Sequence, residues 1–582
     1  MERNNLLEKY FPFLIFVIVF VAFTPSLANR FVDWDDAPLI LFNNDFRGLG
    51  IANIKWMFST FHMSHYQPLT WLSLAIDYCL WGLNPFGYHL TNILLHSLAA
   101  AFLAKASLML FRIGRLGYAA SFVGAFFAAL FFAVHPLRAE SVSWLTERRD
   151  VLSTCLFMMA IWSYIRGCLD NTSEKGILSS KRLVPCFFLY ICACFSKSMA
   201  VTLPAVLLLL DFYPLKRISL PLRKDFIPVL VEKIPFFAFA AALSLFYYFI
   251  VGKYVDIPYT QAYMPSAAKA IYAYWFYLLK TFVPFGLSPV YVPPEGGYFL
   301  PNMIGGIVLL LLTGFAFAIR QKIPAFLTAL LFYFGTLFPA CGLLNGAPVP
   351  AADRYSYIPS IGIAVFLGFA FACLFEKGRF RKTYTVLAVS ILVLIAGLNV
   401  RQQKFWKGST SVWNRVVSVE PRSAIAYNNL ASLVYAKGDI PQAEELMLKA
   451  KDLAPDDFNI NFNCANMYAM SGEYEKALTE YDEVLRKAPT MYEAYIRKAD
   501  MENKLGKYVP AEKTLIAATG IRPDYFQAWH GLAIIRLETQ DFAGAEAALK
   551  ELLRIMPDMP EAKEMLEEAR AGQLAMSSLG SN

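Results

Sequence analysis

Twelve long apolar stretches occupy the first 400 residues of this chain and constrain its fold more than any other feature. A stretch of about 17 to 25 apolar residues is long enough to cross a bilayer as a helix. The twelve lie near residues 11–28, 88–111, 119–135, 151–166, 183–196, 199–213, 234–251, 267–285, 301–319, 324–343, 356–375 and 383–400. Composition agrees, because the chain is 57% hydrophobic and only 17% charged, which is rare in soluble proteins. The sequence therefore predicts an all-α, polytopic membrane helix bundle.

The distribution of charged loops predicts how the bundle is oriented. Lys and Arg collect in loops near residues 112–115, 166–182, 216–233, 320–322 and 377–382, and basic short loops face the cytoplasm. Three apolar stretches separate the third and fourth of these loops, so one stretch cannot cross. We choose 267–285, because its aromatic, Pro-flanked sequence suits an interfacial element. About eleven crossings then place the C-terminal half on the same external side as Asp35. A cleaved signal peptide ending near Ala28 is an alternative for the first stretch, and it also leaves residue 30 outside.

The C-terminal half is built on a 34-residue repeat. Prolines recur at this interval at positions 421, 455, 489, 523 and 557. Small residues and turn glycines keep the same spacing at Ala431, Ala465, Ala499, Ala533, Ala443, Ala477, Ala511, Ala545, Gly438, Gly472 and Gly506. This is the tetratricopeptide period, in which paired helices meet at small residues and a proline follows the second helix. We predict a membrane domain at 1–400 and an α-solenoid at 401–582. Its full repeats span about 424–557, between a leading helix near 406–419 and a capping helix near 561–570.

The inner helices of such a solenoid present a concave groove that commonly binds peptides. Asn429, Asn463 and Arg497 fall at one repeat position on these helices, so they are candidates for binding an extended acceptor backbone. Ordinary solvated side chains are the simpler alternative, because helical phase alone does not specify a ligand.

Two adjacent acids, Asp35 and Asp36, follow the first apolar stretch directly. Carboxylates at a membrane surface are costly to desolvate, which favours a functional role such as a general base. Capping of a short helix is the structural alternative. Asp33 and Asp35 are also spaced like metal ligands, but further acids at suitable spacing are missing, so we expect no cofactor and keep a divalent ion as the minor alternative.

External-side cations are few, and they are the candidates for binding an anionic substrate group. Lys197 lies in a hairpin too short to leave the membrane surface, and the others are Arg138, Arg148, Arg149 and Arg354. Arg148 and Arg149 could instead pair with Glu147 and Asp150 in a structural network. Nine scattered cysteines lack metal-ligand spacing, which argues against a zinc site or a disulfide scaffold. The positive excess lies in short loops, so no nucleic-acid partner is expected.

Several short motifs occur in a specific order along nearly the whole chain. They are Trp34-Asp35-Asp36, Asn43-Asn44-Asp45, Tyr66-Gln67-Pro68-Leu69-Thr70, Trp81-Gly82, Asn84-Pro85, Tyr88-His89-Leu90, Asn92, His96, His135-Pro136 through Glu140, Val142 and Arg148, Ser196-Lys197, Leu203-Pro204, Ala352-Asp353-Arg354-Tyr355 and Pro359-Ser360-Ile361-Gly362. In this order they resemble the transmembrane and tetratricopeptide repeat-containing O-mannosyltransferases and their bacterial relatives, members of the GT-C glycosyltransferase superfamily.

The resemblance implies an inverting enzyme that moves a mannose-like sugar from a polyprenyl-phosphate lipid to Ser/Thr hydroxyls of exported proteins, without a metal. Asp35 or Asp36 matches the acid that meets the acceptor, and the resemblance does not choose between them. The donor phosphate is expected at Lys197, Arg138, Arg148 and Arg354, with Glu140, His89, Asp353 and Tyr66 in support. Arg138 departs from the histidine expected of animal members.

Two other functions stay open. The bundle could be a non-catalytic anchor for a peptide-binding scaffold, although one crossing would anchor four repeats. The enzyme could instead glycosylate a lipid or a polysaccharide. Short loops without long inserts favour a bacterial inner membrane with a periplasmic repeat domain, and an endoplasmic-reticulum protein would look similar.

Overall fold

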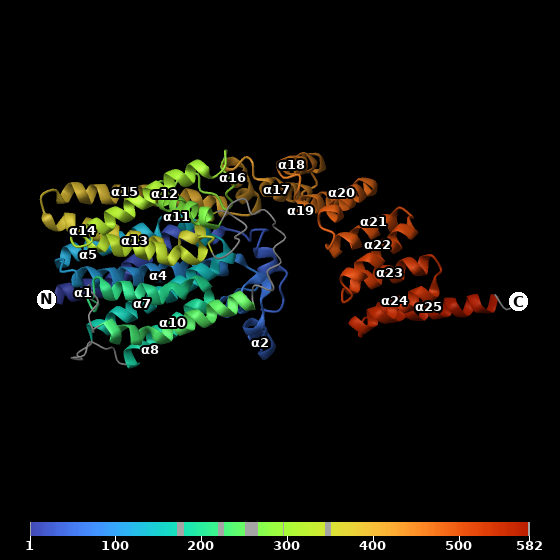
Figure 1. The fold of residues 1–582 in the computed structure, drawn as a ribbon, viewed down its shortest axis with the longest axis horizontal. Helices are drawn as coiled ribbons and strands as arrows, with labels where there is room; N and C mark the ends of the chain where they lie inside the picture. The colour runs from blue at the N-terminus through green and yellow to red at the C-terminus, as the bar shows by residue number, and fades with distance from the viewer. Residues whose placement is uncertain are drawn as a thin grey trace. The chain divides into compact units, whose positions relative to one another are not determined.

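The structure is a computed structural model that describes residues 2–170, 180–218, 226–250, 266–294, 296–343 and 351–579. Every regular element in these ranges is helical, which confirms the all-α prediction (Figure 1). The chain divides into two compact units, Met1–Pro421 and Arg422–Asn582. Segment 401–421 therefore lies in the unit that holds the apolar helices.

The first unit contains sixteen α-helices among its described residues. They are α1 (Glu2–Phe23), α2 (Ile51–Ser59), α3 (Pro68–Trp81), α4 (Pro85–Ile113), α5 (Tyr118–Ala133), α6 (Arg138–Ser143), α7 (Arg148–Leu169), α8 (Ser180–Ser196), α9 (Leu203–Phe212), α10 (Phe226–Phe249), α11 (Ser266–Phe282), α12 (Phe299–Ala318), α13 (Pro324–Leu337), α14 (Ser360–Lys377), α15 (Arg381–Gln403) and α16 (Ser409–Val419).

Seven helical segments of the described residues are long and apolar enough to cross a membrane. They are Glu8–Ala28, Pro85–Ile113, Leu145–Leu169, Phe226–Phe249, Phe299–Ala318, Ser360–Lys377 and Arg381–Trp406. Three shorter apolar helices join them, and α11, the stretch expected not to cross, is in neither group. The count of eleven crossings stays a prediction, and parts of the basic loops, at 171–179 and 219–225, lie outside the described residues.

Close helix contacts hold the bundle together. Helix α4 packs against α1, α5 and α7, while α5 packs against α14 and α7 against α8. At the contact between α5 and α14, a Cβ added to Gly124 would lie 2.6 Å from the carbonyl oxygen of Gly368. Only glycine permits this approach, as is common where membrane helices pack closely.

The connections between these helices carry the residues that the sequence singled out. They are the segment 29–84 between α1 and α4, which includes α2 and α3, the segment 134–147 between α5 and α7, which includes α6, the turn at Lys197, and the segment 351–359 before α14. Figure 1 shows α2, which belongs to the first of these connections, at the end of the bundle opposite the N-terminus.

The second unit is a series of helix pairs that confirms the predicted repeat. Its helices are α17 (Ala424–Tyr435), α18 (Ile440–Leu453), α19 (Phe458–Met470), α20 (Tyr474–Lys487), α21 (Tyr492–Lys504), α22 (Tyr508–Ile521), α23 (Phe526–Glu538), α24 (Phe542–Ile555) and the capping helix α25 (Pro560–Leu579). The predicted contact alanines are all buried. Gly438, Gly472 and Gly506 adopt positive φ, and Gln540 takes the same conformation at the fourth turn.

Candidate functional site

Asp36 is a buried anchor of the loop that follows α1. Its Oδ2 accepts a hydrogen bond from the Val32 amide at 2.8 Å, and its Oδ1 accepts two from Thr146, from the amide at 2.9 Å and the hydroxyl at 2.6 Å. Burial raises the pKa of Asp36 to about 7 against the opposing effect of these donors. Because both oxygens are engaged, Asp36 ties the loop to the segment that leads into α7.

Asp35 is the unengaged member of the pair. Its side chain is partly exposed, and within the described ranges its carboxylate has no hydrogen bond or ion pair. Burial raises the pKa of Asp35, the nearby cations Arg149 and Arg354 lower it, and Glu147 raises it. Asp35 is thus an available carboxylate beside two guanidinium groups.

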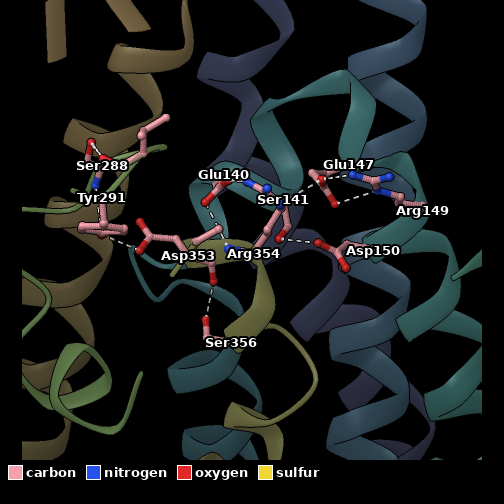
Figure 2. A network of polar contacts seen from close by, with 12 residues as sticks. Glu140, Ser141, Glu147, Arg149, Asp150, Ser288, Tyr291, Asp353, Arg354 and Ser356 are labelled. Carbon is pink, nitrogen blue, oxygen red and sulfur yellow. Dashed lines mark hydrogen bonds and ion pairs between the residues drawn. The ribbon is translucent and has the colours of Figure 1, made fainter. Parts of the chain in front are cut away.

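An ion cluster near Asp35 joins the segment around residues 140–150 to Lys197 and Arg354, and Figure 2 shows Glu140, Glu147, Arg149, Asp150 and Arg354 of this cluster. Glu147 is central to it, because its oxygens lie 2.7 Å from Arg149 Nη2, 3.2 Å from Lys197 Nζ and 3.4 Å from Arg354 Nε. Lys197 also lies 2.5 Å from Asp150. The side chain of Glu147 is fully buried, while those of the three cations keep 11–12% exposure. The three cations therefore keep some contact with solvent, while the Glu147 carboxylate that holds them is buried.

Arg354 enters the cluster from the segment before α14. Its Nη1 donates to Glu140 at 2.6 Å and its amide donates to the same carboxylate at 3.1 Å. The neighbouring Asp353 accepts a hydrogen bond from the Tyr291 hydroxyl at 2.7 Å (Figure 2). Burial raises the pKa of both Glu140 and Asp353, and Arg354 opposes this. Two predicted supporting residues thus position Arg354.

Arg138 contacts the segment that carries Arg354. Its guanidinium is buried between the rings of Phe132 and Tyr357, at 5.3 and 4.9 Å from their centroids, and donates to the Ser356 hydroxyl at 2.7 Å. Burial lowers the pKa of Arg138 to about 10. The Ser356 hydroxyl in turn donates to the Asp353 carbonyl at 2.7 Å, so Arg138 supports the turn that carries Arg354.

Arg148 occupies a separate, closed site. Its side chain is fully buried and pairs with Asp77 at 2.5 Å, and its guanidinium also donates to Asn92, Ser73 and the Tyr88 carbonyl. Every guanidinium nitrogen is engaged within the protein. Of the four cations predicted to bind the donor, Lys197 and Arg354 pair with Glu147 in the ion cluster, whereas Arg138 and Arg148 make their described contacts elsewhere.

The remaining predicted residues are spread more widely. His89 is buried in α4, and the Tyr66 hydroxyl donates to the Phe58 carbonyl at 3.2 Å while its own carbonyl accepts from Tyr247 at 2.6 Å. In the repeats, Asn429 donates to the carbonyl of Ile425 and Asn463 to the side chain of Asn428, while Arg497 is exposed.

The sequence did not single out His65, which lies beside the cluster. Part of the His65 residue reaches solvent, but protein surrounds the imidazole ring. The pKa of His65 falls to about 3 because this desolvates the ring and because Arg149, Lys197 and Arg354 repel a positive charge on it, against the opposing effect of Glu147. Met63 and Ser64, just before His65, adopt positive φ of 54° and 60°, a strain found mainly where surrounding structure enforces it. The sequence signal that could have pointed to His65 is its position directly before the Tyr66-Gln67-Pro68 motif.

Among the described residues, no group of three or more His, Cys, Asp or Glu side chains is placed to bind a metal ion.

Comparison with known proteins identifies relatives of the chain. The tetratricopeptide repeat family matches residues 401–458 and 504–560. Human protein O-mannosyl-transferase TMTC1 is 27% identical over 440 residues, covering 68% of this chain and 48% of that protein. Human protein O-mannosyl-transferase TMTC3 is 23% identical over 586 residues, covering 86% and 61%. The resemblance drawn from the sequence motifs is confirmed, and the chain spans about half to three fifths of the length of these relatives.

Among solved structures, a crystal structure of MamA protein aligns with 26% of this chain and 84% of its own, at 18% identity and a TM-score of 0.25. A score this low does not bear on the fold of the whole chain.

Proposed function

This chain is a relative of the transmembrane and tetratricopeptide repeat-containing O-mannosyltransferases, and we propose that it is an integral-membrane, inverting glycosyltransferase. It moves a mannose-like sugar from a polyprenyl phosphate to Ser/Thr hydroxyls of exported proteins. The repeat domain binds the acceptor in the compartment that contains Asp35, which is the periplasm if the membrane is a bacterial inner membrane.

The observation that carries the proposal is the unengaged carboxylate of Asp35 beside Arg149 and Arg354. A sugar phosphate already has a good leaving group, so transfer requires mainly a base for the attacking hydroxyl and positive charge for the departing phosphate. The oxygen of the acceptor hydroxyl bonds to the anomeric carbon, and Asp35 accepts the proton that this hydroxyl loses. The bond between that carbon and the phosphate oxygen breaks, and its electron pair leaves with the polyprenyl phosphate.

Arg149, Lys197 and Arg354 supply the positive charge. Each is largely buried, keeps some exposure and is paired with a carboxylate of the cluster. These carboxylates hold the cations in place before the donor arrives, which limits the reorganisation needed when charge develops on the leaving phosphate. We keep Lys197 and Arg354 from the sequence prediction, add Arg149, and leave out Arg148 because its guanidinium is fully engaged elsewhere.

An apolar cavity in the same bundle supports a lipid donor. Residues of α4, α7, α9, α13 and α14 line it, among them Leu103, Met158 and Phe332. Met158 follows Asp150 by eight residues on α7, which places it about 12 Å along the helix from the cluster. A polyprenyl chain whose phosphate lies at the cations can therefore extend toward this cavity.

The decisive experiment uses membranes that contain the full chain. They are supplied with a polyprenyl phosphate carrying radioactive mannose and with exported proteins from a strain that lacks the gene. We expect label on Ser or Thr, and a loss of at least about 100-fold in Asp35→Asn, since general base catalysis contributes that much. Asp45→Asn is the matched control, because Asp45 is an exposed acid in the same loop.

The other functions give different results. Label in a lipid or polysaccharide would show that the acceptor class is wrong. If the wild-type chain transfers no sugar and the deletion strain loses no glycopeptide, the chain is a scaffold rather than an enzyme.

A further inference from the structure

The segment that follows the last membrane helix lies against the first external loop. We call residues 404–419 the linker segment; it contains α16 and belongs to the first compact unit. The Lys407 carbonyl accepts a hydrogen bond from the Arg30 amide at 3.0 Å, and the Ser409 hydroxyl accepts one from the Asp33 amide at 2.7 Å. The second contact lies two residues before Asp35.

Four tryptophans extend this contact. Trp34 stacks on Trp144 with ring centroids 4.8 Å apart and an interplanar angle of 14°, and it meets Trp413 of the linker at 5.1 Å. Trp144 also stacks on Trp406 of the linker at 5.4 Å. Trp144, Trp406 and Trp413 are fully buried. The residue that directly precedes Asp35 is therefore held by rings from two other segments.

On the other side of Asp35 in the sequence, Asp36 is held by Thr146, which follows Trp144 by two residues. Two fixed points thus flank Asp35, the Trp34 ring and the Asp36 carboxylate. The Trp34 ring is held in part by Trp413 of the linker segment, whereas the described hydrogen bonds of the Asp36 carboxylate involve no linker residue.

We propose that the linker segment is a positioning element of the catalytic centre, in which Trp413 and Ser409 fix Trp34 and Asp33 and so direct the carboxylate of Asp35. The inference rests on the proposed function for its effect on turnover. Its structural part, the ordering of the loop by the linker, stands independently. Trp413 contacts the loop at Trp34 and Ser409 contacts it at Asp33, so both act through the position of Asp35.

Variants of the full chain separate positioning from general stability. Trp413→Ala removes one ring from the stack, and Trp413→Phe keeps an aromatic ring. Ser409→Ala removes one hydrogen-bond acceptor. Ser418→Ala is its matched control, because this hydroxyl is on the same helix and donates only to the Arg415 carbonyl of its own helix.

The first measurement is steady-state transfer. In Trp413→Ala we expect kcat to fall about 100-fold, as a displacement of about 1 Å at a reacting group does, with the KM for the donor unchanged. The loss of one hydrogen bond in Ser409→Ala is expected to lower kcat about fivefold. Trp413→Phe should restore most of the activity, and Ser418→Ala should match the wild type.

The second measurement is amide hydrogen exchange of residues 30–36, which needs no activity. We expect exchange to rise in Trp413→Ala and Ser409→Ala and to stay at the wild-type rate in Ser418→Ala. If the wild-type chain transfers no sugar, the proposed function fails while this measurement still tests the linker. Wild-type exchange and wild-type kcat in both Ser409→Ala and Trp413→Ala would overturn the inference, and Ser409→Ala decides it if Trp413→Ala does not fold.

Discussion

Asp36 and Thr146, which are 110 residues apart in the sequence, are joined by two hydrogen bonds to one carboxylate oxygen. With the Val32 amide on the other oxygen, these bonds use both oxygens of Asp36 to close the loop. The consequence for Asp35 is that it alone of the two acids offers a carboxylate to a substrate. Neutralising each acid should therefore have different effects.

Asp36→Asn should destabilise the protein, whereas Asp35→Asn should not. An asparagine can present one carbonyl oxygen to Thr146, but its NH2 group then faces the Val32 amide, which loses its acceptor. Leaving one buried donor unpaired costs about 1–3 kcal/mol. Thermal unfolding in detergent measures the difference, and equal melting temperatures for the two variants would contradict the anchoring role of Asp36.

The transfer rate should fall on the acid side at a pH above the ordinary range of an aspartate. Burial raises the pKa of Asp35, and the base acts only when deprotonated, so activity is lost as the pH drops through this raised pKa. Arg149→Gln removes a cation that lowers the same pKa, so the acid limb should move to higher pH. The pH dependence of kcat/KM measures both effects, with Asp45→Asn as the control. A limb that stays fixed in Arg149→Gln would mean that Asp35 is not the titrating base.

Lys197 and Arg148 should separate donor binding from stability. Lys197→Gln is expected to raise the KM for the donor about tenfold or more, because a partly exposed, charged phosphate contact is lost. Buried Asp150 also loses its cation in this variant but keeps the hydrogen bond from the Ser141 hydroxyl, so we expect a smaller loss of stability than in Arg148→Gln. Arg148→Gln instead leaves Asp77 buried without its partner, which costs about 3–5 kcal/mol of unfolding free energy. Kinetics and thermal unfolding of both variants test this contrast. The assignment fails if Lys197→Gln lowers stability as much as Arg148→Gln does and leaves the KM unchanged.

We expect His65→Ala to lower kcat/KM about fivefold to tenfold, because a neutral imidazole near Arg149, Lys197 and Arg354 can hydrogen-bond to the substrate, and the variant loses that one bond. His65→Gln, which keeps a neutral hydrogen-bonding group, should recover part of the loss. The imidazole has a pKa of about 3, so the effect of His65→Ala should be the same at pH 6 and pH 8. An effect that grows sharply below pH 6.5 would show instead that His65 acts as a charged group.

The apolar helices and the repeat could be predicted well because the sequence patterns that indicate them involve residues close together in the chain. The proline at position 455 follows the end of α18 at Leu453 by two residues, and the same spacing marks the next three pairs. The first apolar stretch, predicted near 11–28, lies within a candidate span at Glu8–Ala28. Helix length and repeat period depend on residues close in sequence, so hydrophobic and proline spacing record them directly.

The candidate site could be predicted only in part. The acids of the first loop and the cations Lys197 and Arg354 are visible as charges where charge is scarce. The choice between Asp35 and Asp36 depends on Thr146, and the exclusion of Arg148 depends on Asp77. Both are long-range contacts that a charge pattern does not record. His65 was missed because an exposed histidine in a loop has no distinctive spacing.

The tryptophan contacts across positions 34, 144, 406 and 413 set a rule for recombining proteins of this kind. A chimera joined just after residue 400 would combine the front half of one parent with Trp406 and Trp413 of another, and mismatched rings would then meet beside Asp35. A junction at Pro421 keeps all four rings from one parent. Repeat arrays should therefore be exchanged after α16, at Pro421, and not directly after the last membrane helix.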